Sequence, residues 1–236
     1  AGEPRVVVVE GPPGVGKSRL AEWLTARAAE VGAARPLKAL FRPEEPAAAA
    51  VRRMVERGIQ VRHLTGGDLC ERLEEVFDAA PEWAESVASV FEAPEVSGAA
   101  YGALIDVLQR LSDVRPLVLW LDDVGARPES LAFAERLRER FDGGVLVLAS
   151  GTDPAWREAA DAVVTLGPLR TREMGEMIRR HLPLERGLLQ ELCGRAAGNP
   201  KFALALMSGW LQGDRLVLTP KGFRLDGPLE AISDLA

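Results

Sequence analysis

The sequence has little of the material from which disulfide scaffolds, zinc sites and membrane spans are built. It contains two cysteines, Cys70 and Cys193, and two histidines among 236 residues. The cysteines are far apart and lack the histidine spacing of a zinc site, so we interpret them as reduced, buried thiols. No apolar run approaches the roughly 18 residues that a membrane span needs, and no secretory signal precedes the first predicted strand. The sequence therefore predicts a soluble, cytoplasmic protein with no membrane contact.

An excess of positive charge is also missing. The formal net charge is −6, from 29 lysines and arginines against 35 acidic residues. A nucleic-acid groove needs clustered lysine and arginine, so nucleic acid is not expected as the main ligand. Hydrophobic residues make up 47% of the chain and charged residues 27%, which is typical of a globular protein. The length suits one α/β domain with a small satellite.

A glycine-rich segment near the N-terminus, residues 11–18, fits the phosphate-binding loop pattern G-x-x-x-x-G-K-[S/T]. An apolar stretch, residues 5–10, precedes it and predicts a buried strand, and a helix-forming stretch, residues 20–28, follows. The glycines let backbone N–H groups surround an anionic oxygen, and the helix start adds partial positive charge. We therefore predict a bound nucleoside triphosphate, held by Gly11, Pro12, Pro13, Gly14, Val15, Gly16, Lys17, Ser18 and Arg19.

Within this loop, Lys17 is predicted to reach the β- and γ-phosphates and Ser18 to bind Mg²⁺. A second motif supports this assignment, because the apolar residues 117–121 run directly into Asp122 and Asp123. Such a run is typical of a central parallel strand with a functional carboxyl end. Beside a phosphate loop, Asp122 would bind Mg²⁺, mostly through water, and Asp123 would orient or deprotonate the attacking water as a catalytic residue together with Lys17.

Another apolar strand is predicted at residues 145–149. Ser150 or Thr152, which follow it, are candidates for sensing the γ-phosphate, although ordinary turn chemistry explains them equally well. Strands are also predicted at residues 36–42 and 162–166.

Amphipathic helices are predicted between residues 43 and 113, and we interpret this stretch as a helical insertion without recognisable chemistry. Its Arg52, Arg53 and Arg57 are interpreted as one solvated helix face and not as a second substrate pocket. The fold prediction is α/β: a phosphate-loop NTPase core over residues 1–167, with a three-layer parallel sheet flanked by helices.

Beyond Pro168 the pattern changes from alternating strands and helices to helices alone. Residues 168–213 are predicted to form a small helical lid, in which Asn199 caps a helix and Pro200 occupies its first turn. Residues 214–236 are predicted to form a β-hairpin or the start of a next module. Because the chain begins so close to its first strand, we expect it to be an excised domain of a longer protein.

Three segments together carry a family resemblance: Gly11-x-x-x-x-Gly16-Lys17-Ser18, residues 117–123, and residues 198–203. They resemble the STAND class of AAA+-related ATPases, found in large bacterial regulators that include fusions to Ser/Thr kinases, adenylyl cyclases and LuxR-type activators. The resemblance implies a switch that holds ADP when closed, opens on exchange for ATP and then forms a nucleotide-dependent homo-oligomer. It also implies that Pro200 packs on the adenine and that protein partners include neighbouring domains of the same chain.

The sequence departs from this class in three places. Val124-Gly125-Ala126 stands where many relatives have His-Trp after the acidic pair, and Ser150-Gly151-Thr152 stands where relatives often have an arginine. The N-terminal segment that usually helps to enclose the base is also missing. These departures weigh against efficient hydrolysis. They leave open which arginine completes the site, with the candidates Arg127, Arg136, Arg157 and Arg170.

The sequence thus predicts an ATP-binding, Mg²⁺-dependent regulatory domain of a larger bacterial signalling protein, with ATP or ADP and Mg²⁺ as cofactors. As an enzyme it would be a slow ATPase that converts ATP and water to ADP and phosphate. Two alternatives remain open, a DNA loader or initiator of the AAA+ type and a non-hydrolysing nucleotide-binding scaffold. A GTPase is disfavoured, because Asp122-Asp123-Val124-Gly125 fits D-x-x-G but no N-K-x-D tetrad occurs.

Overall fold

The computed structural model describes residues 2–227, which form two compact units. The first unit consists of residues 2–10 and 17–165, and the second consists of residues 11–16 and 166–227. Residues 228–236, which belong to the predicted 214–236 module, lie outside the described residues. No helix in residues 2–227 combines the length and the apolar character that a transmembrane span requires.

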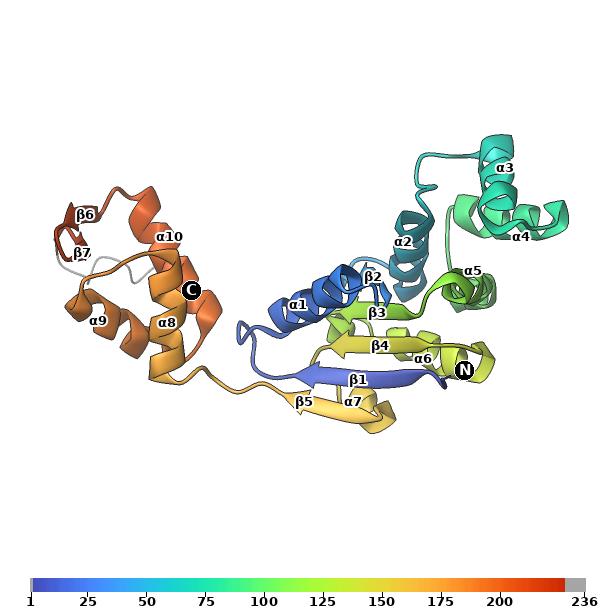
Figure 1. Cartoon of the computed structure of the whole chain (residues 1–236). Helices are drawn as coiled ribbons and strands as arrows, with labels where there is room; N and C mark the ends of the chain where they lie inside the picture. Colours follow the sequence, from blue (N-terminus) through green and yellow to red (C-terminus); the bar gives the residue numbers. More distant parts are fainter. Residues whose placement is uncertain (1, 228–236) are drawn as a thin grey trace. The chain divides into compact units, whose positions relative to one another are not determined.

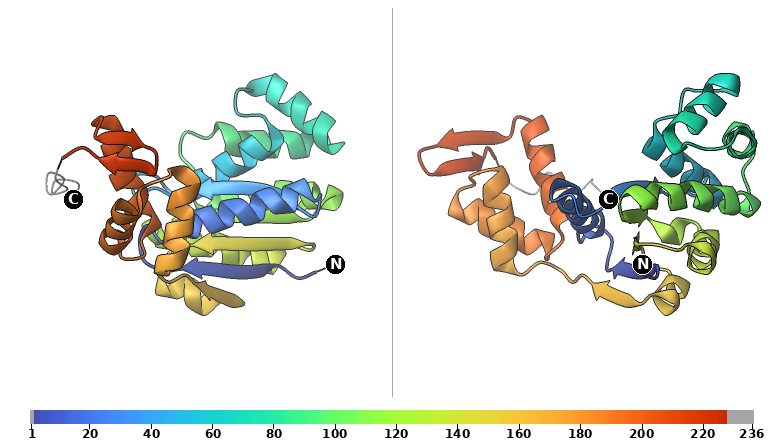
Figure 2. Two further views of the ribbon diagram at one scale, coloured as in Figure 1. Left: turned by 60° about the vertical axis from the view of Figure 1, so that its left-hand side comes forward. Right: turned by 45° about the vertical axis from the view of Figure 1, so that its right-hand side comes forward.

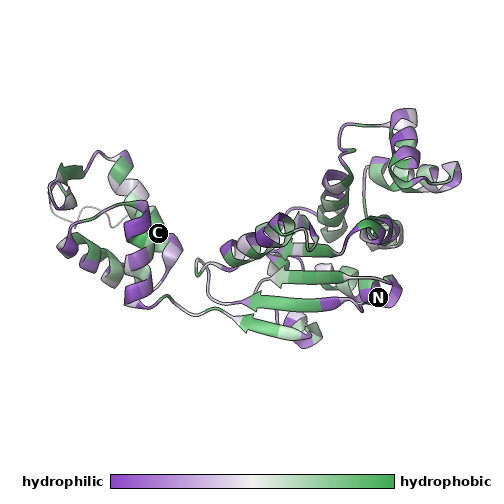
Figure 3. Cartoon of the chain, in the orientation of Figure 1, coloured by the Kyte–Doolittle hydropathy of each residue, from purple (hydrophilic) through white to green (hydrophobic). Residues whose placement is uncertain are grey.

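A five-stranded parallel sheet is the framework of the first unit (Figure 1). Its order is β2-β3-β4-β1-β5, and every neighbouring pair is parallel. The strands are apolar almost throughout, as Figure 3 shows, and all six residues of β3 are buried. The bounds are β1 (Arg5–Glu10), β2 (Arg35–Leu40), β3 (Leu117–Asp122), β4 (Val145–Ser150) and β5 (Ala162–Thr165).

Both faces of this sheet are covered by helices (Figure 2). The step from β1 to β2 crosses the sheet in one direction, whereas the steps from β2 to β3, β3 to β4 and β4 to β5 cross it in the other. Right-handed crossovers therefore place α1 on one face and the later helices on the opposite face. The helices are α1 (Lys17–Glu30), α2 (Ala47–Ile59), α3 (Gly66–Phe77), α4 (Pro81–Glu92), α5 (Tyr101–Val114), α6 (Leu131–Arg140) and α7 (Pro154–Ala159).

The stretch predicted as a helical insertion, residues 43–113, contains α2 to α5 and a short 3-10 turn, Gly98–Ala100. Its helices bury their apolar stripes in one continuous core with the sheet, where Leu73, Leu104 and Leu108 are fully enclosed. The stretch is thus packed as part of the same core and does not form a core of its own.

The interpretation of the α2 arginines as one solvated face is wrong for two of the three. Arg52 is half-buried, and its Nη1 donates to the carbonyl oxygen of Ala93 at 2.6 Å. Arg53 is also half-buried and forms an ion pair with Glu45. Only Arg57 is exposed, because α2 is packed between β2 and the helices that follow it.

Two short segments of the first unit lie before and after β4. Before β4, a 3-10 turn, Pro128–Ser130, leads into α6. Helix α7 was not predicted because it has only six residues, too few to show a helical period. It begins where the Asp153 side chain accepts a hydrogen bond from the Ala155 N–H, with a proline in its first turn.

The second unit has a hydrophobic core of its own around Trp210, Ile178 and Leu192. The predicted Asn199 cap is confirmed, because its Oδ1 accepts from the Phe202 N–H at 3.3 Å. An antiparallel hairpin follows the helices, so the fold-class prediction is confirmed in both parts. The elements are α8 (Thr171–His181), α9 (Arg186–Ala196), α10 (Pro200–Gln212), β6 (Leu216–Thr219) and β7 (Gly222–Leu225).

Both cysteines are free thiols. Cys193 is buried and Cys70 is half-buried, so the prediction of buried thiols holds fully only for Cys193. Burial raises the pKa of each thiol, which disfavours the reactive thiolate.

Candidate functional site

The candidate site of the first unit lies at Asp122, where the neighbouring strands β2, β3 and β4 end. In the sheet register, Asp122 of β3 lies between Leu40 of β2 and Ser150 of β4. Asp122 is only 7% exposed, so its carboxylate requires polar partners within the protein. Parallel strands present their carboxyl ends at one edge of the sheet, which is where ligands bind in open α/β folds.

The Asp122 carboxylate has three such partners, one of them from the phosphate-binding loop motif. Ser18, the second residue of α1, donates its hydroxyl to Asp122 Oδ1 at 2.9 Å. Ser150 donates to the same oxygen at 2.6 Å, and Lys38 Nζ lies 3.1 Å from Oδ2. The two residues predicted to bind Mg²⁺, Ser18 and Asp122, are thus brought together from positions 104 residues apart.

Lys38 is a site residue that the sequence reasoning missed. Its Nζ also lies 3.5 Å from the centroid of the Trp120 ring, where a cation is favoured by the ring's negative face. Lys38, Trp120 and Asp122 share one face of the sheet because they occupy alternate or paired positions of β2 and β3. The available signal was a lysine in the middle of β2, between the apolar residues Leu37 and Ala39.

The oxygen atoms at this point suit a hard cation. A serine hydroxyl and a carboxylate are ligands that Mg²⁺ accepts, with phosphate oxygens and water completing its octahedral shell. Within residues 2–227, no group of three or more His, Cys, Asp or Glu side chains is arranged to hold a metal ion. Ser18 and Asp122 therefore fit a magnesium ion that arrives with a phosphate ligand.

Asp123, the predicted catalytic acid, follows directly after β3 and is exposed. Its backbone lies in the left-handed region, with φ 60°, which turns the chain sharply out of the strand. Gly151 packs closely against this turn, since a Cβ at Gly151 would lie 2.7 Å from the Val124 side chain. This close contact explains why residue 151, directly after Ser150, is a glycine. Thr152 is exposed, so of the two sensor candidates only Ser150 lies at the Asp122 carboxylate.

Glu10 ends β1 and immediately precedes the loop. It accepts a hydrogen bond from the Thr165 hydroxyl at 2.7 Å and forms an ion pair with Arg157. The Thr165 hydrogen bond, followed by that of Arg157, lowers the pKa of Glu10. These contacts tie β5 and α7 to the point at which the chain leaves β1.

The loop residues 11–16 belong to the second unit and contact the start of α10 there. The Asn199 Nδ2 donates to the carbonyl oxygen of Pro13 at 3.1 Å, and the Lys201 N–H donates to that of Gly14 at 3.2 Å. Gly14 has φ 80°, and a Cβ there would lie 2.5 Å from Asn199 Oδ1. The contact therefore requires a glycine at position 14.

A mostly apolar cavity of about 350 Å³ lies in the same unit. Its lining brings loop residues together with the end of α9 and the start of α10, and Phe202 contributes an aromatic side chain that is 39% exposed. Pro200, predicted to contact adenine, begins α10 but is not a lining residue. The cavity is lined by Pro12, Pro13, Val15, Pro168, Arg195, Ala196, Ala197, Gly198, Asn199 and Phe202.

The arginines predicted as site candidates differ in their surroundings. Arg157 forms the ion pair with Glu10, and Arg127 Nε donates to the carbonyl oxygen of Arg42 at 3.1 Å. Arg19, predicted to bind nucleotide, is exposed and forms an ion pair with Glu22 at 2.8 Å. Arg136 is exposed.

A sequence model of the AAA ATPase domain family matches residues 1–148, more than half of the chain. The chain belongs to the AAA ATPase domain family. This confirms the recognition of an AAA+-related phosphate-loop ATPase domain, and with it nucleotide binding as the general property of the fold. No curated protein sequence matches the chain.

The chain is also similar to solved structures, at low sequence identity. A RuvB mutant from Thermotoga maritima is 16% identical with a TM-score of 0.47, and the match covers 86% of this chain and 54% of that one. A STAND protein with a tetratricopeptide repeat sensor from Pyrococcus horikoshii is 14% identical with a TM-score of 0.47, covering 83% and 26%. A chain of the E. coli HORMA:CdnC:Trip13 complex is 14% identical with a TM-score of 0.45, and the match covers 89% of this chain and 68% of that one. The chain thus spans about half of the RuvB chain and a quarter of the STAND protein.

Proposed function

We propose that this domain is a nucleotide switch that binds ATP and ADP with Mg²⁺ and hydrolyses ATP slowly. The observation that carries the proposal is the hydrogen bond between Ser18 and Asp122, which joins the phosphate-loop motif to the acidic end of β3. Family membership supports nucleotide binding in general. The magnesium dependence, the slow turnover and the switching are our inference.

The proposed roles follow from the chemistry of each group. Lys17 holds the β- and γ-phosphates, and Ser18 and Asp122 hold the metal ion, which supplies neutralisation of phosphate charge when bound. Asp123 orients the attacking water or takes its proton. No arginine occurs in Gly151-Thr152-Asp153, directly after β4, and Ser150 is already bonded to Asp122, so neither position offers a free cation or hydroxyl to stabilise a transition state. This is our reason for proposing slow turnover.

The apolar cavity of the second unit has a lining that suits a nucleotide base. An adenine ring is planar and apolar on its faces, so it suits a cavity with one aromatic and several aliphatic side chains. Phe202 is the side chain best suited to stack on the ring. The contact of Pro200 with adenine stays a prediction, and Pro200 begins α10 next to the lining residue Asn199.

We propose a cytoplasmic domain within a larger bacterial signalling protein, acting on neighbouring domains, protein partners or further copies of itself. The resemblance of three motifs to the STAND class supports this setting.

The test is the nucleotide content and turnover of the purified chain. Extracted nucleotide is identified by chromatography, and phosphate release is then measured with Mg²⁺ and ATP for the wild type, Asp123→Asn and Asp113→Asn. Asp113→Asn is the matched control, since it makes the same change at an exposed position on α5. We expect bound ADP and slow turnover that falls about a hundredfold or more in Asp123→Asn, as removal of a general base does, and stays unchanged in Asp113→Asn.

Nucleotide binding without any ATP turnover would contradict the proposed ATPase and favour the non-hydrolysing nucleotide-binding scaffold. Equal turnover in Asp123→Asn would contradict the role given to Asp123.

A further inference from the structure

The first unit also contains a cavity, and its lining is rich in positively charged side chains. It measures about 590 Å³ and lies beside the end of β2 and along α2. The charged residues in its lining are five cations and one carboxylate: Lys38, Arg42, Arg53, Arg57, Arg62 and Glu45. The lining therefore carries a net charge of about +4, in a chain whose formal net charge is −6. We call this the cationic cavity.

Most of this charge is left without a partner at contact distance. Glu45 pairs with Arg53, and Lys38 pairs with Asp122. Among the residues that the structure describes, Arg42, Arg57 and Arg62 form no ion pair within 4.0 Å and are exposed. Glu56, the one acidic residue of α2, is paired with Arg52 at 3.4 Å and is also attracted, beyond contact distance, by Arg53, Arg57 and Arg62.

The segments that carry the cations are held in place by the fold. Arg53 and Arg57 are four residues apart on α2 and so share one helix face. At the end of α2, Gln60 adopts a left-handed conformation with φ 61° and the Val61 N–H bonds back to the Glu56 carbonyl, which brings the chain round to Arg62.

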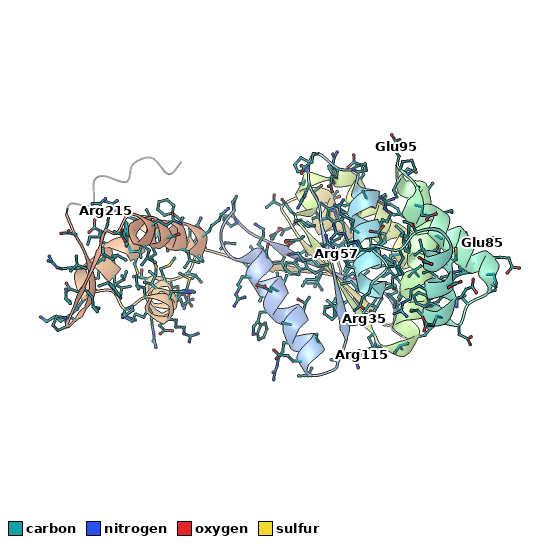
Figure 4. All side chains as sticks on the ribbon, turned by 90° about the horizontal axis from the view of Figure 1, so that it is seen from above. Arg35, Arg57, Glu85, Glu95, Arg115 and Arg215 are labelled. Atoms are coloured by element: carbon teal, nitrogen blue, oxygen red, sulfur yellow. The ribbon has the colours of Figure 1, made fainter. Side chains whose placement is uncertain are left out.

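The loop that carries Arg42 is braced from another part of the unit. Arg127 donates to the carbonyl oxygens of Arg42 and Pro43. Figure 4 labels Arg57 on α2 and Arg35 on β2, two elements that pack against each other at this edge of the sheet. The cations thus come from a strand, a braced loop, a helix and the turn that follows the helix.

These features favour a compact anion with several charges. Arginine binds phosphate oxygens in pairs through its planar fork, and four of the five cations are arginines. The cavity volume falls within the roughly 300–1,000 Å³ of small-molecule sites. An extended nucleic acid would need a basic stripe, and the acidic balance of the chain opposes one. None of the phosphate-loop residues 11–18 lines this cavity.

We propose that the cationic cavity is a second ligand site, which binds a small molecule carrying several phosphate groups. The same chemistry is offered by an inorganic polyphosphate and by a nucleoside polyphosphate. The cavity adjoins the proposed metal site, because Lys38 lines the cavity and pairs with Asp122. Its arginines belong to no part of the proposed nucleotide site, and the proposal does not depend on ATP hydrolysis.

The test measures binding of inorganic tripolyphosphate by calorimetry to the purified chain already saturated with ADP. The variants are Arg57→Gln combined with Arg62→Gln, and the control Arg115→Gln combined with Arg136→Gln, which removes two charges at exposed positions outside the cavity. We expect one tripolyphosphate per wild-type chain, at least about tenfold weaker binding in the first variant, and a change below about twofold in the control. Arg57 and Arg62 are exposed, so their replacement does not disturb the core.

Several outcomes separate the proposals. Equal weakening in both double variants, or no saturable binding by the wild type, would overturn the second site. Tighter binding of a short single-stranded DNA or an acidic peptide than of tripolyphosphate, lost in the first variant, would overturn it in favour of a macromolecular ligand. Tighter binding of a nucleoside tetraphosphate than of tripolyphosphate would support the site and identify the nucleoside as part of its ligand.

ADP affinity, measured with a fluorescent analogue, should not change in the Arg57/Arg62 variant and should fall about tenfold or more in Lys17→Ala. Failure of that measurement would overturn the proposed function without touching the cationic cavity.

Discussion

At the scale of single residues, Asp122 is the centre of the first unit's candidate site. It is nearly buried, and its two oxygens are shared between two hydroxyls and one ammonium group. Lys38 places a cation on the carboxylate that is proposed to bind Mg²⁺. We therefore expect the lysine and the metal ion to compete for the Asp122 carboxylate, because both are cations attracted to the same negative charge.

Replacement of Lys38 by methionine should favour magnesium. Methionine keeps the aliphatic contact with Trp120 and removes the charge, and a partly exposed ion pair contributes about 1 kcal/mol. We expect the Mg²⁺ concentration that gives half-maximal nucleotide binding to fall about fivefold. The measurement is a magnesium titration of a fluorescent ADP analogue bound to the wild type and to Lys38→Met.

The control for this experiment is Lys38→Arg, which keeps the charge and should leave the magnesium midpoint near that of the wild type. A midpoint that rises in Lys38→Met would contradict the competition. In that case Lys38 would be holding Asp122 in the orientation that the metal requires.

The residues of this site differ in how far the sequence alone could find them. Ser18 and Asp122 lie in motifs whose spacing reflects their chemistry, so they could be predicted. Lys38 lies in no motif, and its role depends on β2 pairing with β3 in a register that brings positions 38 and 122 together. In the sequence, Arg53 and Arg57 look like part of an ordinary polar helix face. The helical pattern does not show that other cations from β2 and the neighbouring loops lie beside that face.

At the scale of elements, the start of α10 does two things at once. The Asn199 side chain caps the helix through Oδ1 and bonds to the phosphate-binding loop through Nδ2. The cap was predictable from Asn199-Pro200, since both residues favour a helix start. The second bond was not predictable, because it joins residues 186 positions apart.

Two substitutions of Asn199 should separate these functions. Asn199→Ala removes both bonds and should lower the free energy of unfolding by about 1 kcal/mol, the usual loss of a cap. Asn199→Asp keeps the cap acceptor but loses the Nδ2 donor to Pro13, so it should unfold near the wild-type temperature. We expect ADP binding to weaken several-fold in both variants, as measured by thermal unfolding and calorimetry.

If Asn199→Asp binds ADP as tightly as the wild type, the bond to Pro13 does not position the loop. If instead both variants unfold alike, the cap contributes less than its geometry indicates.

At the scale of the whole molecule, two compact units with separate cores share one continuous chain. The change from alternating strands and helices to helices alone predicted an α/β sheet followed by helices, and the fold has that order. The sequence pattern could not predict that residues 11–16 group with the second unit, because that grouping rests on contacts of Pro13 and Gly14 with Asn199 and Lys201. Local periodicity carries no information about such contacts.

The most direct test of the central claim is calorimetric binding of ATP, ADP and GTP, with Mg²⁺, to the wild type and to Lys17→Ala. We expect one adenine nucleotide bound per wild-type chain, GTP bound at least about tenfold more weakly, and a loss of about tenfold or more in affinity when Lys17 is replaced. A preference for GTP, equal binding by Lys17→Ala, or no binding at all would contradict it.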